Sequence, residues 1–128
     1  MPAPLPHVLV AEDNTLVADA MRLLFEETGH RVTTAGTIVD VVRAASNDPV
    51  DLLLLDLGLS DGDGLEVLTQ LRAIGALPRV IVALTGRDEP EMIERCKAAG
   101  CRDVLLKPMP VPELLRKSRE WLGAAERV

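Results

Sequence analysis

Short apolar runs alternate along the chain with segments in which apolar residues recur at helical spacing. The pattern predicts five strands, at His7–Ala11, His30–Ala35, Asp51–Asp56, Val80–Leu84 and Asp103–Leu106. Three of the runs, VLVA, LLLL and VIVAL, are apolar without interruption. Such runs are typical of strands that helices cover on both faces. We therefore expect the first, third and fourth strands to lie in the middle of a parallel sheet.

The segments between the strands carry helix signals. One predicted helix shows the i, i+3, i+4, i+7 stripe of Ile38, Val41, Val42 and Ala45, with Thr37 placed as its N-cap. Other signals mark a third helix (Leu65, Leu68 and Leu71), a fourth between Pro90 and Gly100, and a fifth (Leu114, Leu115 and Leu122) beginning near Pro110 and Pro112. Strands alternating with helices predict an α/β fold, with a doubly wound parallel sheet.

Length and composition predict one globular domain. The chain has 128 residues, of which 48% are hydrophobic and 27% charged, as in ordinary folded proteins. With one Phe, one Trp and no Tyr, the core has to be aliphatic. We find no repeat or linker, and the residues after Gly123 are too few for another module. We expect a single domain over 1–128 with its core at 7–122.

The charge balance excludes some partners. A formal net charge of −6 argues against direct nucleic-acid binding, which requires a basic surface.

No apolar run approaches the roughly 20 residues of a membrane span, and MPAPLPHVLV lacks the regions of a signal peptide, so we expect a cytoplasmic protein without a membrane partner. Cys96 and Cys101 have no second pair and no neighbouring His, which favours packed free thiols over a zinc site.

Polar residues follow the predicted strands at their carboxyl ends. Glu12 and Asp13 follow the first strand, Asp56 ends the third, Thr85 follows the fourth and Lys107 the fifth. The carboxyl ends of parallel strands share one edge of the sheet, which is where ligands bind in such folds. We therefore expect these five side chains to meet in one pocket.

The residue types in this pocket point to metal and phosphate chemistry. Three clustered carboxylates repel one another unless a cation joins them. Because the ligands are all oxygens, a hard ion is expected, and Mg²⁺ fits best since it accepts carboxylates together with a phosphate oxygen. Lys107 can supply a charge, and Thr85 a hydroxyl, to a phosphoryl group held there.

The order of these residues resembles that of the receiver domain of bacterial two-component response regulators. The match extends from His7 to Leu122 and includes Lys107-Pro108 and the Asp63-Gly64 pair in the loop after Asp56. The resemblance implies a flavodoxin-like (βα)5 fold with strand order 2-1-3-4-5. It also implies a phosphorylation-dependent signalling switch, which is not an enzyme in the usual sense but catalyses its own phosphorylation and dephosphorylation.

By this resemblance, Asp56 is the nucleophile that accepts a phosphoryl group from a phosphohistidine. The donor would be a sensor or hybrid histidine kinase, or a histidine phosphotransfer protein. Asp13, Asp56 and the backbone carbonyl of Gly58 would hold Mg²⁺, with Glu12 acting through water.

The resemblance also assigns the remaining polar groups. Lys107 would pair with the phosphoryl oxygens and Thr85 would hydrogen-bond to one of them, while the Lys107-Pro108 peptide bond would be cis. The phosphorylated domain would change its binding to a downstream protein target. A phosphorylation-dependent homodimer through the fourth and fifth helices is a further hypothesis.

The chain departs from the family pattern near the pocket. Val104 replaces an aromatic that usually moves together with the Thr, so we expect signal output to use backbone or helix shifts, or another face. Ser60 replaces a Pro of the phosphoacceptor loop. Gly58 and Arg87 lie two positions after Asp56 and Thr85, where they should tune access of water to an aspartyl phosphate.

Each residue also has a simpler interpretation. Glu12 and Asp13 alone could cap the helix that follows. The acidic loop residues Asp61 and Asp63, with Gly64, more often shape a turn and open a helix than bind metal, so we leave them out of the site. We interpret His7 and His30, at the starts of strands, as structural or solvated. Trp121 is interpreted as partly buried packing, with a partner contact as the alternative.

Three other functions fit parts of this sequence pattern. A dinucleotide-binding domain is disfavoured because the carboxylates of Glu12 and Asp13 would repel pyrophosphate. A phosphatase of the haloacid-dehalogenase type carries a second Asp two positions after its nucleophile, whereas this chain has Gly58. A constitutive interaction module without phosphorylation stays an alternative. The sequence does not decide between a stand-alone regulator and a domain of a longer protein.

Overall fold

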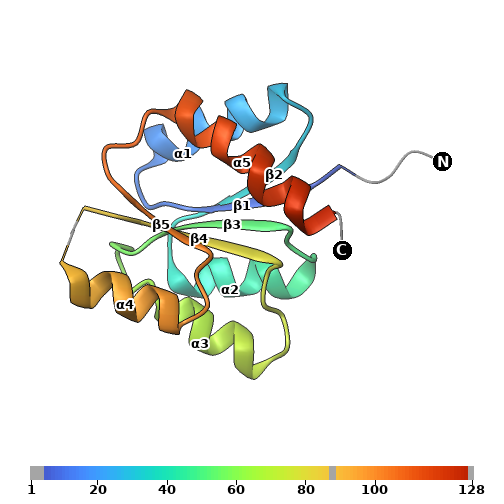
Figure 1. The fold of residues 1–128 in the computed structure, drawn as a ribbon. Coiled ribbons are helices and arrows are strands. Elements are labelled where there is room, and N and C mark those ends of the chain that lie inside the picture. Colours follow the sequence, from blue (N-terminus) through green and yellow to red (C-terminus); the bar gives the residue numbers. More distant parts are fainter. Residues whose placement is uncertain (1–4, 87–88, 127–128) are drawn as a thin grey trace.

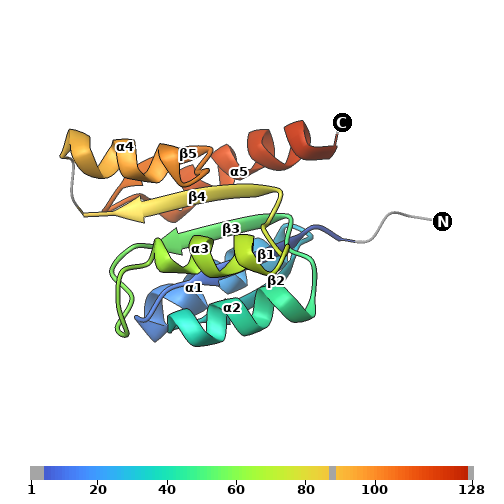
Figure 2. The ribbon, with the colours of Figure 1, turned by 90° about the horizontal axis from the view of Figure 1, so that it is seen from below.

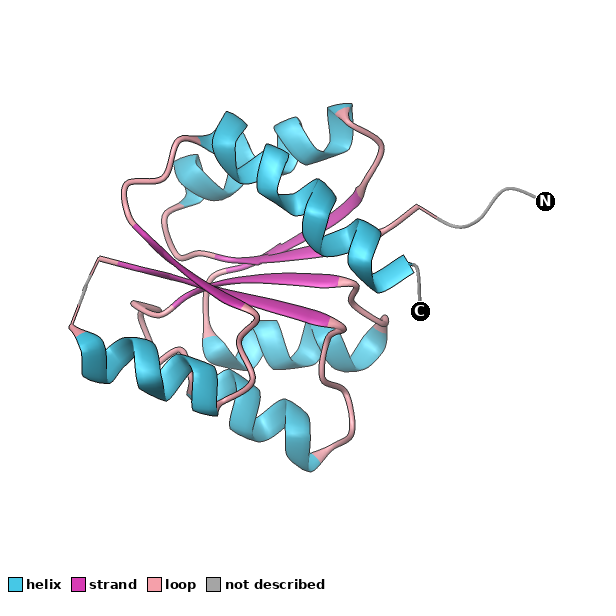
Figure 3. Cartoon of the chain, in the orientation of Figure 1, coloured by secondary structure: helices cyan, strands magenta, loops and turns pink. Residues whose placement is uncertain are grey.

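A computed structural model describes residues 5–86 and 89–126, with side chains to residue 123. It shows a parallel sheet between two layers of helices (Figure 1, Figure 3). The elements are β1 (His7–Ala11), α1 (Thr15–Glu27), β2 (Arg31–Ala35), α2 (Ile38–Asn47), β3 (Leu52–Asp56), α3 (Glu66–Ala73), β4 (Val80–Thr85), α4 (Pro90–Ala98), β5 (Asp103–Leu106) and α5 (Val111–Glu126).

All neighbouring strands are parallel, in the order β2-β1-β3-β4-β5 (Figure 2). The prediction that the three uninterrupted apolar strands are central is confirmed, as is the strand order. β2 begins one residue later than predicted, because the backbone N–H of His30 donates to Phe25 O at the end of α1. β3 also begins one residue later, and β4 extends by one residue to Thr85.

Alternate residues of the strands contribute to two separate hydrophobic cores. Leu53 and Leu55 of β3 pack with α2, α3 and the Cys96 side of α4, whereas Leu52 and Leu54 pack with α1 and α5. The two helical layers lie on opposite faces of the sheet (Figure 1). Trp121 is 4% exposed within the second core, which confirms its interpretation as packing.

Side-chain caps fix where two helices begin. Asn14 Oδ1 accepts from the backbone N–H groups of Leu16 and Val17, and Thr37 Oγ1 accepts from Asp40 N. Thr37 is therefore the N-cap that the sequence predicted. The alternative that Glu12 or Asp13 caps the first helix is wrong, because Asn14 occupies that position and leaves both carboxylates at the end of β1.

Cys96 and Cys101 are free and buried, as predicted. Among the described helices, none combines the length and the hydrophobicity of a membrane-spanning segment.

Candidate phosphoacceptor and metal site

The carboxyl ends of the strands surround a cavity of about 710 Å³. Its lining includes every residue that the sequence placed in the site, namely Glu12, Asp13, Asp56, Gly58, Thr85 and Lys107. Parallel pairing brings these residues together, since β1, β3 and β4 end side by side and β5 delivers Lys107 from the edge. The predicted meeting of the five polar side chains is confirmed.

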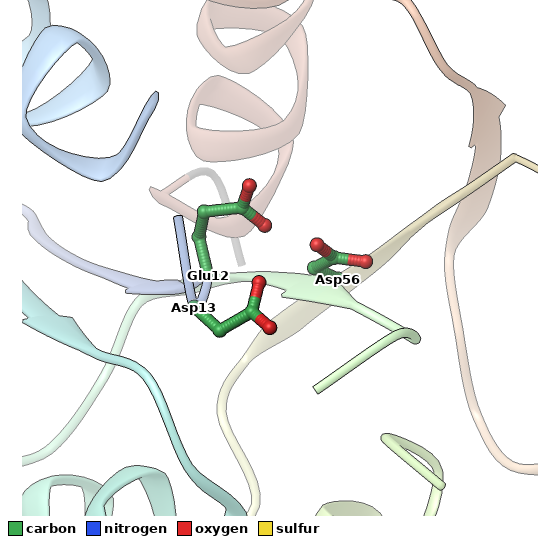
Figure 4. Close-up of side chains that lie close together, drawn as sticks. All are labelled: Glu12, Asp13 and Asp56. Carbon is green, nitrogen blue, oxygen red and sulfur yellow. The ribbon is translucent and has the colours of Figure 1, made fainter. Parts of the chain in front are cut away.

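Three carboxylates form the negative side of the cavity. Glu12, Asp13 and Asp56 converge at the ends of β1 and β3 (Figure 4), and each offers an oxygen within 4.8 Å of the others. Glu12 and Asp56 are buried, whereas Asp13 is exposed. Two of the three charges are therefore largely removed from water, which makes a compensating cation valuable.

Lys107 supplies part of that compensation. Its Nζ donates to Asp56 Oδ2 at 2.5 Å and lies 3.5 Å from Glu12 Oε2. The other oxygen of Asp56, Oδ1, accepts from the backbone N–H of Gly58 at 2.9 Å. Asp56 is thus held by a cation on one oxygen and by the β3–α3 loop on the other.

The backbone also aims Lys107. Its N–H donates to Thr85 O at 2.8 Å, so the ends of β4 and β5 remain paired beyond the strands. The Lys107-Pro108 peptide bond is cis, as the resemblance implied. Thr85 is 3% exposed and lines the cavity.

The two buried carboxylates differ in acidity. Burial raises the pKa of Asp56, but its interactions with Glu12, with the Lys107 ammonium and with the Gly58 amide outweigh burial and hold this pKa below the usual range. Burial raises the pKa of Glu12 to about 7, and the nearby Asp56 carboxylate adds to this rise. Asp56 is therefore the ionised member of the pair near neutral pH, as a nucleophile has to be.

Lys107 remains charged in this environment. Burial opposes the charged form, but the carboxylates of Asp56 and Glu12 hold the pKa of Lys107 above its usual value. The ammonium is thus a permanent positive charge at the site.

Glu12 also provides an acceptor suited to a cation. Among the described residues, its buried Oε2 has no hydrogen-bond partner, since Lys107 Nζ lies outside hydrogen-bonding geometry. An unsatisfied buried acceptor needs a water or an ion. The donor set contains only oxygens, which fits Mg²⁺ bound directly or through water.

The loop after β3 contains two acids with different roles. Asp61 Oδ1 accepts from Ile38 N at 2.7 Å, so this residue caps α2 and does not open its own helix. Asp63 Oδ1 accepts from Leu65 N at 3.0 Å near the start of α3, which fits its interpretation as a turn former. Unlike Asp61, Asp63 also lines the cavity.

Arg95 is a cavity residue that the sequence did not single out. It lies on α4 and its Nη2 donates to Asp63 Oδ2 at 2.7 Å. No strand-end rule identifies it, because its position depends on how α4 packs beside the loop after β3.

Other residues named from the sequence lie away from this cavity or outside the described residues. Val104 is half-buried and packs against the core on the α2, α3 and α4 side of the sheet. His7 is buried, with Nδ1 2.9 Å from Pro49 O and Nε2 2.8 Å from Thr33 Oγ1, which confirms a structural role. Arg87 lies outside the described residues.

Comparisons with known proteins indicate the family of this chain. Residues 8–119 match the family model of the response regulator receiver domain. Swarming motility regulation protein RssB of Serratia marcescens is 35% identical over 111 residues, which are 87% of this chain and 50% of RssB. The chain spans about half the length of such curated relatives.

Solved structures show the same fold. A CheY-like receiver domain protein from Methanospirillum hungatei is similar, with a TM-score of 0.87 and 26% identity over 96% of this chain and 98% of that chain. The receiver domain of sensor histidine kinase PA1611 from Pseudomonas aeruginosa has a TM-score of 0.80 and 30% identity, covering 93% of this chain and 98% of that chain. That structure holds a magnesium ion coordinated in its active site cleft. The chain thus belongs to the response regulator receiver domain family of two-component signal transduction.

Proposed function

We propose that Asp56 is the phosphoacceptor of this receiver domain. The observation that carries the proposal is a buried, ionised carboxylate held between Lys107 and the Gly58 amide, inside a cluster of three carboxylates. The donor is the phosphohistidine of a sensor or hybrid histidine kinase, or of a histidine phosphotransfer protein. Phosphorylation then changes the binding of a downstream protein.

Asp56, Lys107 and Thr85 each have a separate role in the phosphoryl transfer. An oxygen of Asp56 attacks the phosphorus, the new O–P bond forms, and the N–P bond breaks with its electron pair returning to the imidazole of the donor. Lys107 exchanges its contact with Asp56 for the phosphoryl oxygens, where its charge stabilises the transition state. The hydroxyl of Thr85 serves as a donor to a phosphoryl oxygen in the product.

Mg²⁺ fits the same pocket. Asp13, Asp56 and the Gly58 carbonyl would hold it, with Glu12 acting through water. When bound, the ion supplies the positive charge that lets the carboxylates and a phosphoryl group share one cavity. The oxygen-only donors and the unsatisfied Glu12 Oε2 support this assignment, and so does the ion in the PA1611 receiver domain.

The direct test is covalent modification by a small phosphodonor. With acetyl phosphate and Mg²⁺, the intact mass should increase by one phosphoryl group. The adduct should be absent with EDTA and in Asp56→Asn, and present in the control Asp19→Asn, which alters an exposed acid on α1. An adduct of equal yield in Asp56→Asn would refute the assignment. Absence of an adduct in every sample, even with a cognate kinase, would refute the phosphoacceptor function.

A phosphorylation-dependent homodimer through α4 and α5 is a second part of the proposal. Light scattering with and without beryllofluoride, an analogue of the phosphoryl group, measures it directly. A molar mass of one chain in both conditions would exclude the dimer while leaving the phosphoacceptor function intact.

A further inference from the structure

An ion pair crosses the mouth of the phosphoacceptor cavity. Arg95 on α4 donates from Nη2 to Oδ2 of Asp63, in the β3–α3 loop, at 2.7 Å. Both residues line the cavity that contains Asp56 and Lys107. The side chains are 54% and 50% exposed, so the pair connects α4 to the loop at the entrance and not in the core.

The ion pair between Arg95 and Asp63 can be replaced by another contact of Arg95, because the pair is weak and only Asp63 has a second hydrogen bond. Ion pairs between exposed side chains contribute little to stability. Asp63 remains fixed without Arg95, since its other oxygen accepts from Leu65 N. The guanidinium of Arg95 has no such second anchor among the described residues, and its long side chain already lines the cavity.

The charges in the cavity favour a contact between Arg95 and a phosphoryl group on Asp56. Among the described lining residues, four are carboxylates and two are cations, Lys107 beside Asp56 and Arg95 beside Asp63. Phosphorylation of Asp56 adds negative charge and new acceptor oxygens to this already acidic space. A guanidinium binds such oxygens through two parallel hydrogen bonds, which a single carboxylate oxygen cannot match.

We propose that Arg95 is a second phosphoryl-binding cation. On phosphorylation, Arg95 breaks its ion pair with Asp63 and contacts the phosphoryl group on Asp56, which releases α4 from the β3–α3 loop. This inference rests on the proposed function of Asp56. It provides a link between the phosphorylated site and α4 in a chain where Val104 replaces the usual aromatic. The alternative is a static tether, in which Arg95 and Asp63 only hold the entrance together.

The two roles predict different changes in beryllofluoride affinity for two substitutions. If Arg95 binds the phosphoryl group, Arg95→Gln should weaken the Mg²⁺-dependent affinity for beryllofluoride by about three- to tenfold. Asp63→Asn should match or exceed the wild-type affinity, because it frees Arg95 while its side-chain oxygen still accepts from Leu65 N. If the pair is a static tether, both substitutions should weaken binding by similar factors.

The titration can be followed by fluorine NMR of bound beryllofluoride. The matched control is Arg116→Gln, which removes the Arg of an exposed ion pair with Glu113 on α5 and should leave the affinity unchanged. Thermal melting checks that each variant is folded. In the wild-type protein, the Nε–H resonance of Arg95 should shift on addition of beryllofluoride and that of Arg116 should not, a readout that needs no substitution.

The outcomes separate this inference from the function on which it rests. If the wild type binds no beryllofluoride in the presence of Mg²⁺, the phosphoacceptor function itself fails. If the wild type binds but Arg95→Gln binds equally well, or if Asp63→Asn and Arg95→Gln weaken binding alike, the role of Arg95 is refuted and that of Asp56 stands.

Discussion

Lys107 sets the charge balance of the site at the scale of a single residue. Its ammonium contacts Asp56 at 2.5 Å and lies 3.5 Å from Glu12, so one cation serves two buried carboxylates. In this arrangement the pKa of Asp56 is lowered, whereas burial raises the pKa of Glu12. Asp56 and Glu12 thereby differ in acidity within one pocket.

Replacing Lys107 by Gln should slow phosphorylation by about a hundredfold, because one preorganised charge is lost from the transition state. The rate is measured from intact mass against time with acetyl phosphate and Mg²⁺. Lys97→Gln, which removes an exposed lysine on α4, is the control and should react at the wild-type rate. A Lys107→Gln variant that reacts as fast as this control would show that the ammonium plays no part in the transfer.

Glu12 gives the protein a pH-dependent stability when no metal is bound. Its pKa is about 7 in the folded state against an ordinary 4.5, so the folded protein binds more protons than the unfolded chain between these values. The free energy of unfolding should therefore fall as pH rises from about 4.5 to 7, by up to about 3 kcal/mol at roughly 1.4 kcal/mol per pKa unit. Asp56, with its lowered pKa, acts in the opposite direction and at lower pH.

Urea unfolding in EDTA at several pH values measures this dependence. Glu12→Gln cannot titrate and should lack the decrease between about pH 4.5 and 7. Parallel curves for the wild type and Glu12→Gln would assign the pH dependence to other groups.

The connection between β3 and α3 is built around a close backbone approach at Gly64. A Cβ placed there would lie 2.8 Å from Leu57 Cα and 2.9 Å from Asp56 O. Gly64 N also donates to Leu57 O at 3.1 Å, which folds the loop back onto the end of β3. The loop therefore contacts the backbone of Asp56, the proposed phosphoacceptor.

Gly64→Ala should lower the free energy of unfolding by about 1–3 kcal/mol, because the backbone of Asp56 and Leu57 would have to shift. Chemical denaturation measures the change. Gly123→Ala is the control. An added Cβ at this position in α5 would meet no described atom within 4 Å beyond its chain neighbours and its own helix backbone, so alanine there should preserve or raise stability. Equal stability of Gly64→Ala and wild type would mean that the loop relaxes without cost.

At the scale of the whole molecule, folding assembles the carboxylate cluster. Glu12 and Asp13 directly follow β1 and Asp56 ends β3, so the carboxylates meet only when the sheet is formed. A cation that binds this cluster stabilises the folded state, by about 2.7 kcal/mol at a concentration of one hundred times Kd.

Mg²⁺ should therefore raise Tm by several degrees in a saturable manner. Asp13→Asn should largely abolish the increase, whereas Asp19→Asn should preserve it. Differential scanning calorimetry measures the shift. An equal increase in Asp13→Asn would place the ion elsewhere on the protein.

The elements could be predicted from the sequence to within one residue wherever a strand is buried on both faces. The apolar runs of β1, β3 and β4 allow no other placement, because every side chain in them is covered by a helical layer. The exact boundaries depended on tertiary contacts. Asp51 accepts from His7 N through its side chain and lies in the turn before β3, which the apolar pattern does not reveal.

The site residues at strand ends were predictable for a similar reason. Parallel strands end at one edge, so the order of Asp56, Thr85 and Lys107 along the chain already predicts their meeting. The residues that follow no strand-end rule were not predictable. Asp61 caps a helix from a different βα unit, and Arg95 reaches the cavity from the face of α4.

The βα alternation, the central strands and the identities of the groups at the carboxyl edge could be predicted from the amino-acid sequence, because they follow from local periodicity and from the common direction of parallel strands. The contacts that each charge makes became known from the packing of the folded chain. Lys107 is shared between Asp56 and Glu12, and Arg95 lies against Asp63, because these distances depend on how separate βα units pack. The pKa values of the carboxylates follow from that packing, since burial and neighbouring charges set them and neither is encoded in a local pattern.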